Sequence, residues 1–479
     1  MSQHPRSRPV WLAIAAASLP MFMATLDNLV VTSALPVIHA DLGASVTQLQ
    51  WITNAYTLAF ASLMLLAVDL GDRWGRRTVF VAGIALFTAA SAACALAADS
   101  TVLVLARALQ GAGAAAVMPL SLTLVAASVP PRLRSLAIGI WGGVSGLGVA
   151  VGPLVGGAVV EGWNWQAIFW LNVPVGVVAV ALAAAALPNG FGARVRADVP
   201  GAALAAIGVF GVVFGVVRGN DAGWTSAQVL GSLGGGALAL GLFLLRQRRA
   251  AAPMLPLRLF RDRSFTVINL VGVTFSFGAF GAVFILVQFL QVVQHRTPLE
   301  AGVMTMPWTL APMVVAPLAG VFGPRIGTRL LVVAGSVLLA AGILATALVM
   351  SPDARFAEMV PGFLLAGVGM GLIFAPSSTA VLATMRPEDH AKASGTNATL
   401  REVGVALGVA VLTAVFTGAG GQLTPDGYVH AARPAVVVGA AAVALAAVIA
   451  VLLPARRRAA AGATATTAAG AMPAELVGA

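Results

Sequence analysis

Uncharged stretches of about 20 residues recur along the chain, and short segments between them hold most of its charged residues. A helix of about 20 apolar residues crosses about 30 Å of hydrocarbon, so each stretch predicts a membrane-spanning helix. Fourteen helices are expected, at about residues 10–36, 48–69, 78–97, 102–126, 135–159, 166–187, 199–218, 225–245, 264–292, 301–321, 329–350, 357–383, 393–417 and 434–454. An even number of spans places both chain ends on one side of the membrane.

Composition supports a membrane environment, because 59% of the 479 residues are hydrophobic and only 9% are charged. Soluble domains carry about 25% charged residues, so this chain has too little polar surface for a soluble globule. The net charge of +11 would suit a nucleic-acid partner. However, the basic residues form short clusters between apolar segments rather than one stripe, so no nucleic acid is expected. The single Cys94 excludes a disulfide framework and a cysteine-based metal site.

The 28 Lys and Arg residues orient the predicted helices, because short cytoplasmic loops are enriched in positive charge. With the N-terminus in the cytoplasm, all but six of them fall in inner segments. The exceptions are Arg107, Arg218, Arg296, Arg355, Arg401 and Arg433. Arg also greatly outnumbers Lys, which favours a GC-rich bacterial source. We therefore expect a multi-pass protein of the bacterial cytoplasmic (inner or plasma) membrane with both termini in the cytoplasm.

A short internal repeat divides the chain. Gly71–Arg77 (GDRWGRR), after the second predicted helix, is echoed by Gly323–Arg329 (GPRIGTR), after the tenth. Internal repeats of this kind are typical of transporters built from two related halves. The expected organisation is a cytoplasmic N-terminus (1–9), a first six-helix half (10–187), an inserted helix pair with a basic linker (188–263), a second six-helix half (264–454) and a disordered cytoplasmic tail (455–479).

Five sequence elements occur in a fixed order along the first half of the chain. They are the segment from Leu26-Asp27-Asn28 to Pro36, the Gly71–Arg77 loop, Arg107–Gly113, the glycine-rich Gly148–Gly157 and Trp165–Pro174. This combination resembles the major facilitator superfamily. Within it, the chain is similar to the fourteen-helix drug:proton antiporters, which include actinobacterial antibiotic exporters such as methylenomycin-resistance proteins. The resemblance implies the all-α major facilitator fold.

The resemblance gives the first loop a gating role. A carboxylate among arginines can accept forked hydrogen bonds and latch one conformation. In the family this loop is understood to hold the cytoplasmic side closed; the alternative is that its charges only set the topology. The gating residues would be Asp72, Arg73, Gly75, Arg76 and Arg77.

The fifth predicted helix is rich in glycine, and small residues allow helices to approach closely and slide. Its proline removes one backbone donor and disturbs the preceding turn. The resemblance implies an antiporter signature at the interface of the two halves, whereas the alternative is packing without a link to transport. The signature residues would be Gly148, Gly152, Pro153, Gly156 and Gly157.

Three ionisable residues within predicted helices are candidates for proton coupling, because buried charges in membrane spans are costly. Asp27 and Arg107 lie at similar depths at a rise of 1.5 Å per residue, so they are expected to pair directly or through Gln110. Protonation of Asp27 would release Arg107; a purely structural ion pair is the alternative. Glu402 lies near the bilayer middle, with Arg401 about 100° away around the helix. Glu402 is either a second protonation or cation-recognition site or a partner for a neighbouring polar group.

A substrate cavity is expected from one face of the helix at 264–292, which presents Phe277, Gly281, Phe284, Gln288 and Gln291. Aromatic rings with two amides would suit an apolar ligand with a few hydrogen-bonding groups, although such stripes also serve packing. Further cavity candidates are Asn54, Tyr56, Gln110, Trp141, Trp308, Phe374 and Asn397.

The sequence thus predicts a proton-coupled antiporter that exports small, largely apolar drugs, antibiotics or secondary metabolites by alternating access. It would act as a monomer with no cofactor, and its partners would be its substrate, protons and the lipid bilayer. An importer of the same fold is the main alternative, and a transport-silent sensor is a third. An enzyme is disfavoured, because the five His residues are scattered and no nucleophile and base have a usable spacing.

Overall fold

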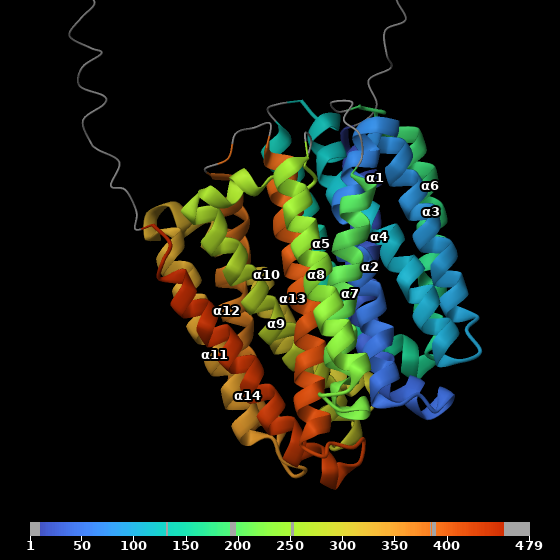
Figure 1. The fold of residues 1–479 in the computed structure, drawn as a ribbon, viewed down its shortest axis with the longest axis vertical. Helices are drawn as coiled ribbons and strands as arrows, with labels where there is room; N and C mark the ends of the chain where they lie inside the picture. The colour runs from blue at the N-terminus through green and yellow to red at the C-terminus, as the bar shows by residue number, and fades with distance from the viewer. Residues whose placement is uncertain are drawn as a thin grey trace, which may run out of the picture.

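The computed structural model describes residues 10–130, 133–191, 198–250, 253–383, 385 and 389–454. These form fourteen α-helices and one short 3-10 helix, η2, in one bundle of long helices (Figure 1). The elements are α1 (Val10–Leu42), α2 (Val46–Trp74), α3 (Arg76–Ala95), α4 (Ser100–Ser128), α5 (Arg134–Gly162), α6 (Gln166–Ala186), α7 (Val199–Ala222), α8 (Ala227–Arg249), η2 (Leu257–Arg261), α9 (Arg263–Val292), α10 (Pro298–Ile326), α11 (Thr328–Val349), α12 (Phe356–Ala383), α13 (His390–Gly418) and α14 (Pro425–Ala450).

The all-α membrane fold is confirmed, and the fourteen helices agree with the expected number. Twelve of them are individually long and apolar enough to cross a bilayer. Helix α2 meets the same criterion when its two segments, which are bent by 49° between Met64 and Leu66, are counted as one span. Helix α5 is 29 residues long, and within the described part of it Val151–Gly162 counts as a shorter apolar helix. The segments 1–9 and 455–479 lie outside the described residues.

Several helices extend beyond their expected ends. Helix α1 continues through Pro36 to Leu42, because a proline inside a membrane helix is tolerated where neighbouring groups satisfy the freed backbone. The segment Gly71–Arg77, expected as a loop, is instead the end of α2, the single residue Gly75 and the start of α3.

The conformation of Gly75 supports the internal repeat. Its φ is +100°, and Gly327, which joins α10 to α11 at the corresponding place, has a φ of +96°. Such angles favour glycine over residues with a Cβ. The two copies therefore share the same backbone break, although three of their seven residues differ.

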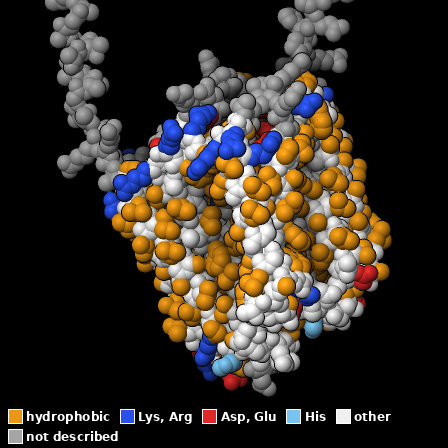
Figure 2. All heavy atoms as spheres, viewed as in Figure 1, with side chains coloured by type: hydrophobic (Ala, Val, Ile, Leu, Met, Phe, Trp, Pro, Cys, Tyr) orange, Lys and Arg blue, Asp and Glu red, His pale blue; other side chains and the backbone are white. Residues whose placement is uncertain are grey.

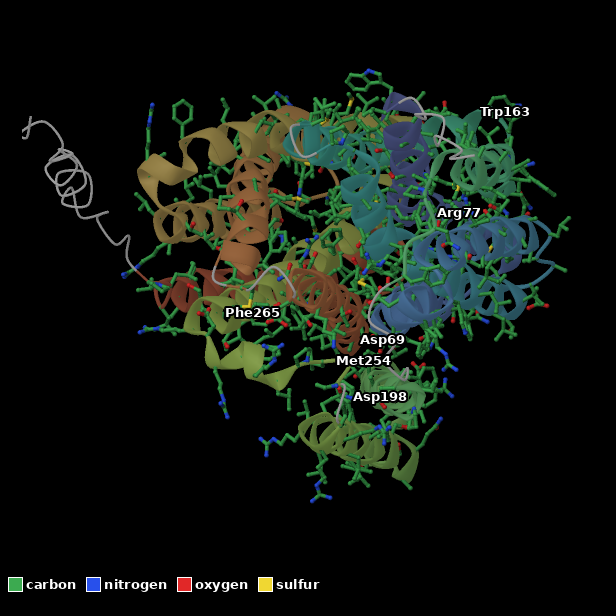
Figure 3. All side chains as sticks on the ribbon, turned by 90° about the horizontal axis from the view of Figure 1, so that it is seen from above. Asp69, Arg77, Trp163, Asp198, Met254 and Phe265 are labelled. Carbon is green, nitrogen blue, oxygen red and sulfur yellow. The ribbon has the colours of Figure 1, made fainter. Side chains whose placement is uncertain are left out.

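Helices α1–α6 pack mainly among themselves, as do α9–α14, and the two groups meet where α2 contacts α13 and α5 contacts α10. Helices α7 and α8 pack on each other and lie outside this body, with α7 against α2 and α13 (Figures 1 and 3). An apolar cluster seals the place where three helices meet. It comprises Leu58 of α2, Val213 and Val217 of α7, and Ala406 and Ala410 of α13. The inserted pair therefore covers one of the two seams between the halves.

The molecular surface has an apolar belt and one strongly basic end (Figure 2). Large apolar side chains such as Leu105, Leu238 and Val314 are more than 60% exposed around the bundle, as expected for a surface in contact with lipid. We call the end at which α2 and α8 finish and α9 begins the basic end. Its described basic residues are Arg73, Arg76, Arg77, Arg246, Arg248, Arg249, Arg258, Arg261, Arg263, Arg325, Arg329 and Lys392.

At the basic end, Asp198 ties the inserted pair together. It caps α7 and accepts hydrogen bonds from Arg246 and Gln247 of α8, each at 2.6 Å. Burial opposes ionisation of Asp198, but these hydrogen bonds outweigh it and hold the pKa of the carboxyl below its ordinary value. Gln247 in turn accepts from the Leu255 backbone, and Arg258 pairs with Asp389 beside α13. The linker is thus attached to both the inserted pair and the second half.

Asp198→Asn is therefore expected to destabilise the protein. At neutral pH the variant loses charge-assisted hydrogen bonds worth about 1.5–3 kcal/mol each. The midpoint of thermal unfolding should fall by about 2–4 °C or more, measured on the purified protein. Asp221→Asn is the matched control, because the Asp221 contacts are exposed: a 3.7 Å pair with Arg218 and a 3.2 Å hydrogen bond from the Thr47 hydroxyl. Equal midpoints for Asp198→Asn and Asp221→Asn would show that the Asp198 cluster does not stabilise the fold.

Candidate functional site

An ion pair lies in the middle of the first six helices. Arg107 of α4 donates through Nη1 to Oδ2 of Asp27 on α1 at 2.6 Å, and both side chains are only 1% exposed. Both helices are otherwise strongly apolar over their spans. The pair that the sequence suggested on depth alone is thus present as a direct contact.

Neutral polar groups complete what we call the charge network: Asp27, Arg107, Gln110, Asn172 and Ser91. Gln110 accepts from Arg107 at 2.7 Å and donates to Oδ1 of Asp27 at 2.9 Å. Asn172 of α6 donates to the same Oδ1 at 2.7 Å and to Ser91 of α3 at 3.1 Å. Four helices thus contribute to the network, and Asp27 accepts three hydrogen bonds from side chains of α4 and α6.

Helix α2 also contacts the Arg107 side chain. Its guanidinium carbon lies 4.2 Å from the centre of the Tyr56 ring, and Nε donates to the Ile52 carbonyl at 3.3 Å. This close approach depends on Gly111, since a Cβ there would lie 2.2 Å from the Tyr56 carbonyl oxygen. Tyr56, expected in the substrate cavity, therefore belongs to the surroundings of the charge network.

Asn172 and Ser91 belong to the charge network but were not predicted from the sequence. Asn172 lies in the quoted Trp165–Pro174 element, and an amide in an otherwise apolar helix was the available signal. Ser91 carried no comparable signal, because a serine in a membrane helix usually bonds its own backbone. Here it donates to the Phe169 carbonyl of α6 at 2.9 Å.

The charge network holds one buried carboxylate against one buried guanidinium. Breaking a buried ion pair by neutralising one partner costs about 3–5 kcal/mol, because the other charge is left uncompensated. A proton on Asp27 would impose that penalty on Arg107. The arrangement can therefore convert protonation into a driving force for moving α1 relative to α4.

The expected gating residues lie at the junction of α2 and α3. Asp72 and Arg76 form a partly exposed pair at 2.7 Å, and Arg77 donates to the carbonyls of Ala184 and Leu187 at the end of α6. Arg73 is exposed. The hydrogen bonds and ion pairs described for Asp72, Arg76 and Arg77 do not reach the second half, so the latch role remains a prediction.

The glycine-rich part of α5 contacts two helices. Gly148, Gly152 and Gly156 recur every four residues and face α1, where a Cβ at Gly156 would lie 3.0 Å from the Val30 backbone. Gly157 and Pro153 face α10 instead. A Cβ on Gly157 would lie 2.2 Å from the Pro298 carbonyl oxygen, and one on Gly302 of α10 would lie 2.4 Å from the Pro153 carbonyl oxygen. The segment thus packs one face on α1 and the other on the seam between the halves.

A small apolar cavity, which we call the inter-half cavity, lies beside Pro153. Helices α1, α5, α9, α10 and α12 line it with Leu29, Pro153, Ala279, Phe280, Val283, Leu286, Val287, Thr305, Trp308, Thr309, Phe363 and Met370. Its volume is about 40 Å³, against roughly 300–1,000 Å³ for a pocket that holds a drug-sized molecule. Trp308 was expected here. Binding of a drug would require the halves to separate.

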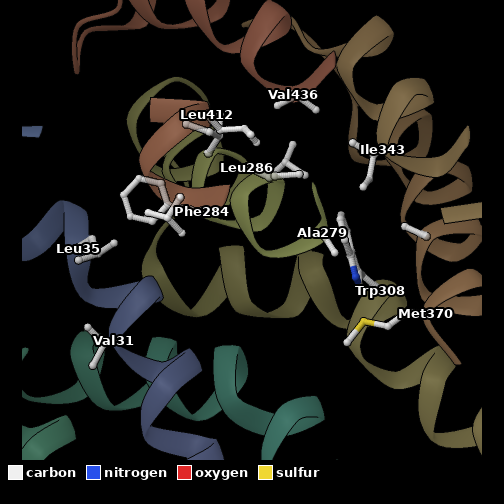
Figure 4. Close-up of a cluster of buried hydrophobic side chains, with 14 of the residues drawn as sticks. Val31, Leu35, Ala279, Phe284, Leu286, Trp308, Ile343, Met370, Leu412 and Val436 are labelled. Carbon is white, nitrogen blue, oxygen red and sulfur yellow. The ribbon is translucent and has the colours of Figure 1, made fainter. Parts of the chain in front are cut away.

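The face of α9 that the sequence favoured is used differently. Gly281 meets the Gly408 carbonyl of α13, and Phe277 packs against Gly408. Phe284 is fully buried and Gln288 donates to its carbonyl, while Gln291 donates to the Ser33 carbonyl of α1. Figure 4 shows Trp308 and Met370 near Ala279, away from Phe284 and Leu412. The inter-half cavity therefore uses a neighbouring face of α9.

The remaining cavity candidates are distributed over both halves. Trp141 of α5 donates to Ser121 of α4 at 3.0 Å, and Asn397 of α13 donates to Asn269 of α9 at 3.1 Å. Asn54 of α2 is fully buried, and neither atom of its amide has a hydrogen-bond partner among the described residues. Of these three, Asn54 is therefore the one with an unpartnered buried amide in the described part of the chain.

Two charged residues of α13 lack the compensation seen at Asp27. In the described part of the chain, Oε2 of Glu402 and Nε of Arg401 are buried without a hydrogen-bond partner. The Arg401 guanidinium lies 4.3 Å from the centre of the Phe374 ring. Such stacking contributes about 0.5–2 kcal/mol, whereas a charge at the centre of a membrane helix costs about 2.5–3.5 kcal/mol. Stacking alone does not offset that cost, so Arg401 and Glu402 are candidates for function.

Glu402 faces the first half. It precedes Ala406 and Ala410 at four-residue intervals, and these pack in the same cluster as Leu58 of α2. It is also near enough to Tyr56 for an electrostatic interaction with the phenol. Glu402 therefore lies across the α2–α13 seam from the charge network.

Hydrogen bonds between the two six-helix groups occur, among the described residues, at the end opposite the basic end. Gln291 of α9 donates to the Ser33 carbonyl of α1 at 2.9 Å, and the Leu299 backbone of α10 donates to Glu161 of α5 at 3.3 Å. Together with the Gly157–Pro298 contact, these bonds hold the halves closed at that end.

Comparisons with known proteins agree with this architecture. The chain is 36% identical over 411 residues to the multidrug resistance protein Stp of Mycobacterium tuberculosis, covering 85% of this chain and 76% of that protein. It is 34% identical over 433 residues to the tetracenomycin C resistance and export protein of Streptomyces glaucescens (90% and 80% covered). It is also 34% identical over 416 residues to the methylenomycin A resistance protein of Streptomyces coelicolor (86% of each).

A solved structure supports the fold independently. The inward-facing crystal structure of a bacterial homologue of the human lysosomal transporter Spinster superposes with a TM-score of 0.65 at 18% identity, covering 94% of this chain and 98% of that one. The family model of the Major Facilitator Superfamily matches residues 17–409 and again 268–477. The chain therefore belongs to the Major Facilitator Superfamily, and the resemblance in its five sequence elements is confirmed.

Proposed function

We propose that this protein is a proton-coupled antiporter that exports small, largely apolar drugs or antibiotics across a bacterial cytoplasmic membrane. Three relatives at 34–36% identity are named for multidrug resistance, for tetracenomycin C resistance and export, and for methylenomycin A resistance. The apolar lining of the inter-half cavity suits substrates of this kind. No cofactor is needed in this proposal, since the proton gradient supplies the energy.

One observation carries the coupling proposal: Asp27 and Arg107 form a buried pair at 2.6 Å in which Asp27 is the only carboxylate. In the proposed cycle, the ionised Asp27 binds Arg107 and keeps α1, α4 and α6 together through Gln110 and Asn172. Protonation from outside weakens this grouping and favours the return step. Release of the proton to the cytoplasm restores it, so export and proton entry alternate.

Glu402 is proposed as a second site of protonation. Its unpartnered carboxylate oxygen lies on the α2-facing side of α13, near Tyr56, which itself contacts Arg107. A charge change at Glu402 therefore acts on the seam between the halves. Asp27 and Glu402 would respond to the same gradient from opposite sides of this seam.

Alternating access is proposed to open and close the α5–α10 seam. The present conformation is held at the end opposite the basic end by Gln291–Ser33 and Leu299–Glu161. With the basic end in the cytoplasm, as the positive-inside rule requires, these bonds close the external side. They must break for release of the substrate to the outside.

The proposed orientation makes a direct prediction. Epitope tags inserted in the 246–263 linker or after Arg458 should be inaccessible to membrane-impermeant reagents in intact cells. A tag between α9 and α10, at His295, should be labelled, since this loop lies at the opposite end. Labelling is compared before and after permeabilisation. External labelling of the linker or the tail would show that the orientation is inverted or that the number of membrane spans is not fourteen.

Resistance profiling tests the proposed function. The gene is expressed in a bacterial host lacking its own drug pumps, and a broad compound panel is applied with and without a protonophore. An exporter raises the inhibitory concentration of some compounds and lowers their cellular content, and the protonophore removes both effects. Higher cellular content would indicate an importer, and no change for any compound would reject transport of drugs.

A further inference from the structure

A second pocket, which has polar as well as apolar walls and which we call the Arg401 pocket, lies within the second half and is separate from the inter-half cavity. Helices α9, α12 and α13 line it with Ile268, Gly272, Phe275, Ile373, Phe374, Ser377, Ser378, Asn397 and Arg401. Two hydroxyls, one amide and one guanidinium therefore line a space whose other walls are apolar. The neighbouring rings Phe275 and Phe374 meet edge to face with centroids 5.5 Å apart, which fixes the aromatic wall.

The side chain of Arg401 is held in place by its surroundings. Its stem passes over Gly272, where a Cβ would lie 3.2 Å from the Arg401 Cγ atom. The guanidinium then stacks on Phe374 at 4.3 Å. A planar cation with a fixed stem and a stacked face presents its N–H edge in a defined direction.

Arg401 differs from Arg107 in its charge balance. Arg107 is neutralised by Asp27, whereas no ion pair to Arg401 occurs within the described residues. Glu402, the next residue in the chain, interacts electrostatically with Arg401. However, Glu402 faces the α2–α13 seam and not the Arg401 pocket. Nε of Arg401 and Oγ of Ser377 are both buried, and no described residue accepts from or donates to them.

We propose that the Arg401 pocket binds the anionic head group of the exported molecule, so the substrates include aromatic or amphipathic organic acids. A carboxylate or phenolate oxygen accepts charge-assisted hydrogen bonds from a guanidinium, and the Ser377 hydroxyl supplies a further donor. The ring of such an acid can stack beside Phe374. This inference rests on the proposed export function and names the chemical class of its substrates.

The position of the pocket suits the first step of export. Along α9 it extends from Ile268 to Phe275, about 8–18 Å from the helix start at the basic end at 1.5 Å per residue. The inter-half cavity begins at Ala279, further along the same helix. An acid entering from the basic end meets Arg401 before it reaches the apolar lining around Trp308.

The size of the pocket fits a head group alone. Its volume is about 10 Å³, which is roughly the room of one water-sized group. A carboxylate oxygen can occupy this space, whereas a ring requires side chains to move. Charge recognition at Arg401 is therefore separate from the apolar selection at the inter-half cavity.

Binding of two matched probes to the purified, full-length protein in a neutral detergent tests the inference. At pH 7.4, 1-naphthoate is anionic and 1-naphthamide is neutral, while their rings are identical. Dissociation constants are measured for the wild type, Arg401→Gln, Arg401→Lys and Ser377→Ala. Arg218→Gln is the control, because Arg218 is exposed at the opposite end and forms only a 3.7 Å pair.

The wild type should bind 1-naphthoate at least about tenfold more tightly than 1-naphthamide, as expected for one charge-assisted contact. Arg401→Gln should remove this preference, Arg401→Lys should keep part of it, and Ser377→Ala should weaken it several-fold. Arg218→Gln should bind as the wild type does. If Arg401→Gln does not yield monodisperse protein, the Arg401→Lys and Ser377→Ala results decide.

The inference is overturned if the two probes bind equally, if 1-naphthoate does not bind at millimolar concentration, or if the variants keep the full preference. Added phosphatidylglycerol provides a further test. If this lipid occupies the site in an Arg401-dependent manner and excludes 1-naphthoate, the pocket serves membrane lipid and not cargo. Binding needs no gradient, so a protein that prefers 1-naphthoate but exports nothing would refute the proposed function alone.

Discussion

Asp27→Asn is expected to abolish uphill drug efflux and its dependence on the proton gradient. Asn keeps the shape of the side chain but is always neutral, so Arg107 can no longer be paired and released as the pH changes. The loss should be at least about tenfold in the initial rate of gradient-driven efflux, because losing a buried pair costs about 3–5 kcal/mol. Asp27→Glu, which keeps the charge, should retain part of the activity.

The same substitution also leaves Arg107 buried without a carboxylate, so a loss of folding must be separated from a loss of coupling. The double variant Asp27→Asn, Arg107→Gln removes both charges. Replacing a buried ion pair by neutral groups is often nearly neutral for stability, so the double variant should unfold close to the wild-type temperature. It should nevertheless remain unable to drive uphill efflux.

These two variants distinguish a coupling pair from a structural one. A structural pair predicts that the double variant recovers efflux together with stability. Gradient-dependent efflux at the wild-type rate in either variant would move the coupling role elsewhere. Glu402 would then be the leading candidate, to be tested by Glu402→Gln.

Gly157→Ala is expected to have the second largest effect. A Cβ at this position would lie 2.2 Å from the Pro298 carbonyl oxygen and 2.6 Å from the Leu299 Cα. Both neighbours are backbone atoms of α10, so they cannot move aside without separating the helices. The α5–α10 seam should therefore stay open at the end opposite the basic end, and efflux should fall by about tenfold or more, since overpacking typically costs 1–3 kcal/mol.

Cysteine labelling reports this change in conformation. A cysteine placed at Thr305, which lines the inter-half cavity, should react faster with an external impermeant maleimide when Gly157 is replaced. The native Cys94 is buried and should contribute little. Gly162→Ala is the matched control on the same helix, because nothing lies within 4 Å of a Cβ there. Unchanged labelling and efflux in Gly157→Ala would exclude this seam from the transport cycle.

Charge and depth in the sequence were sufficient to predict the Asp27–Arg107 contact, because few ionisable residues occur in membrane spans and two at one depth tend to meet. The glycine-rich face of α5 was also recognisable, since small residues at four-residue spacing permit close packing. Which neighbour each glycine contacts was not predictable. Gly156 meets α1 and Gly157 meets α10, and only the tilt of the helices decides this.

The substrate face of α9 shows the limit of pattern analysis. The stripe from Phe277 to Gln291 has helical spacing, but it packs against α13 and α1, and the inter-half cavity is lined by Phe280, Val283 and Val287. In a membrane helix nearly every face is apolar, so periodicity does not identify the face that lines a cavity. Likewise, Ser91 joins the charge network through a long-range contact that no local pattern encodes.

Proton movement driven by drug transport tests the central claim most directly. Everted membrane vesicles are energised so that protons are pumped into them and their interior becomes acidic. This proton gradient is followed with a pH-sensitive fluorescent dye. The drug against which the wild type gives the strongest resistance is then added. With the wild type, the drug should dissipate part of the gradient within seconds; with Asp27→Asn present at the same level, the gradient should not change. Equal drug-induced dissipation in both proteins would contradict coupling through Asp27.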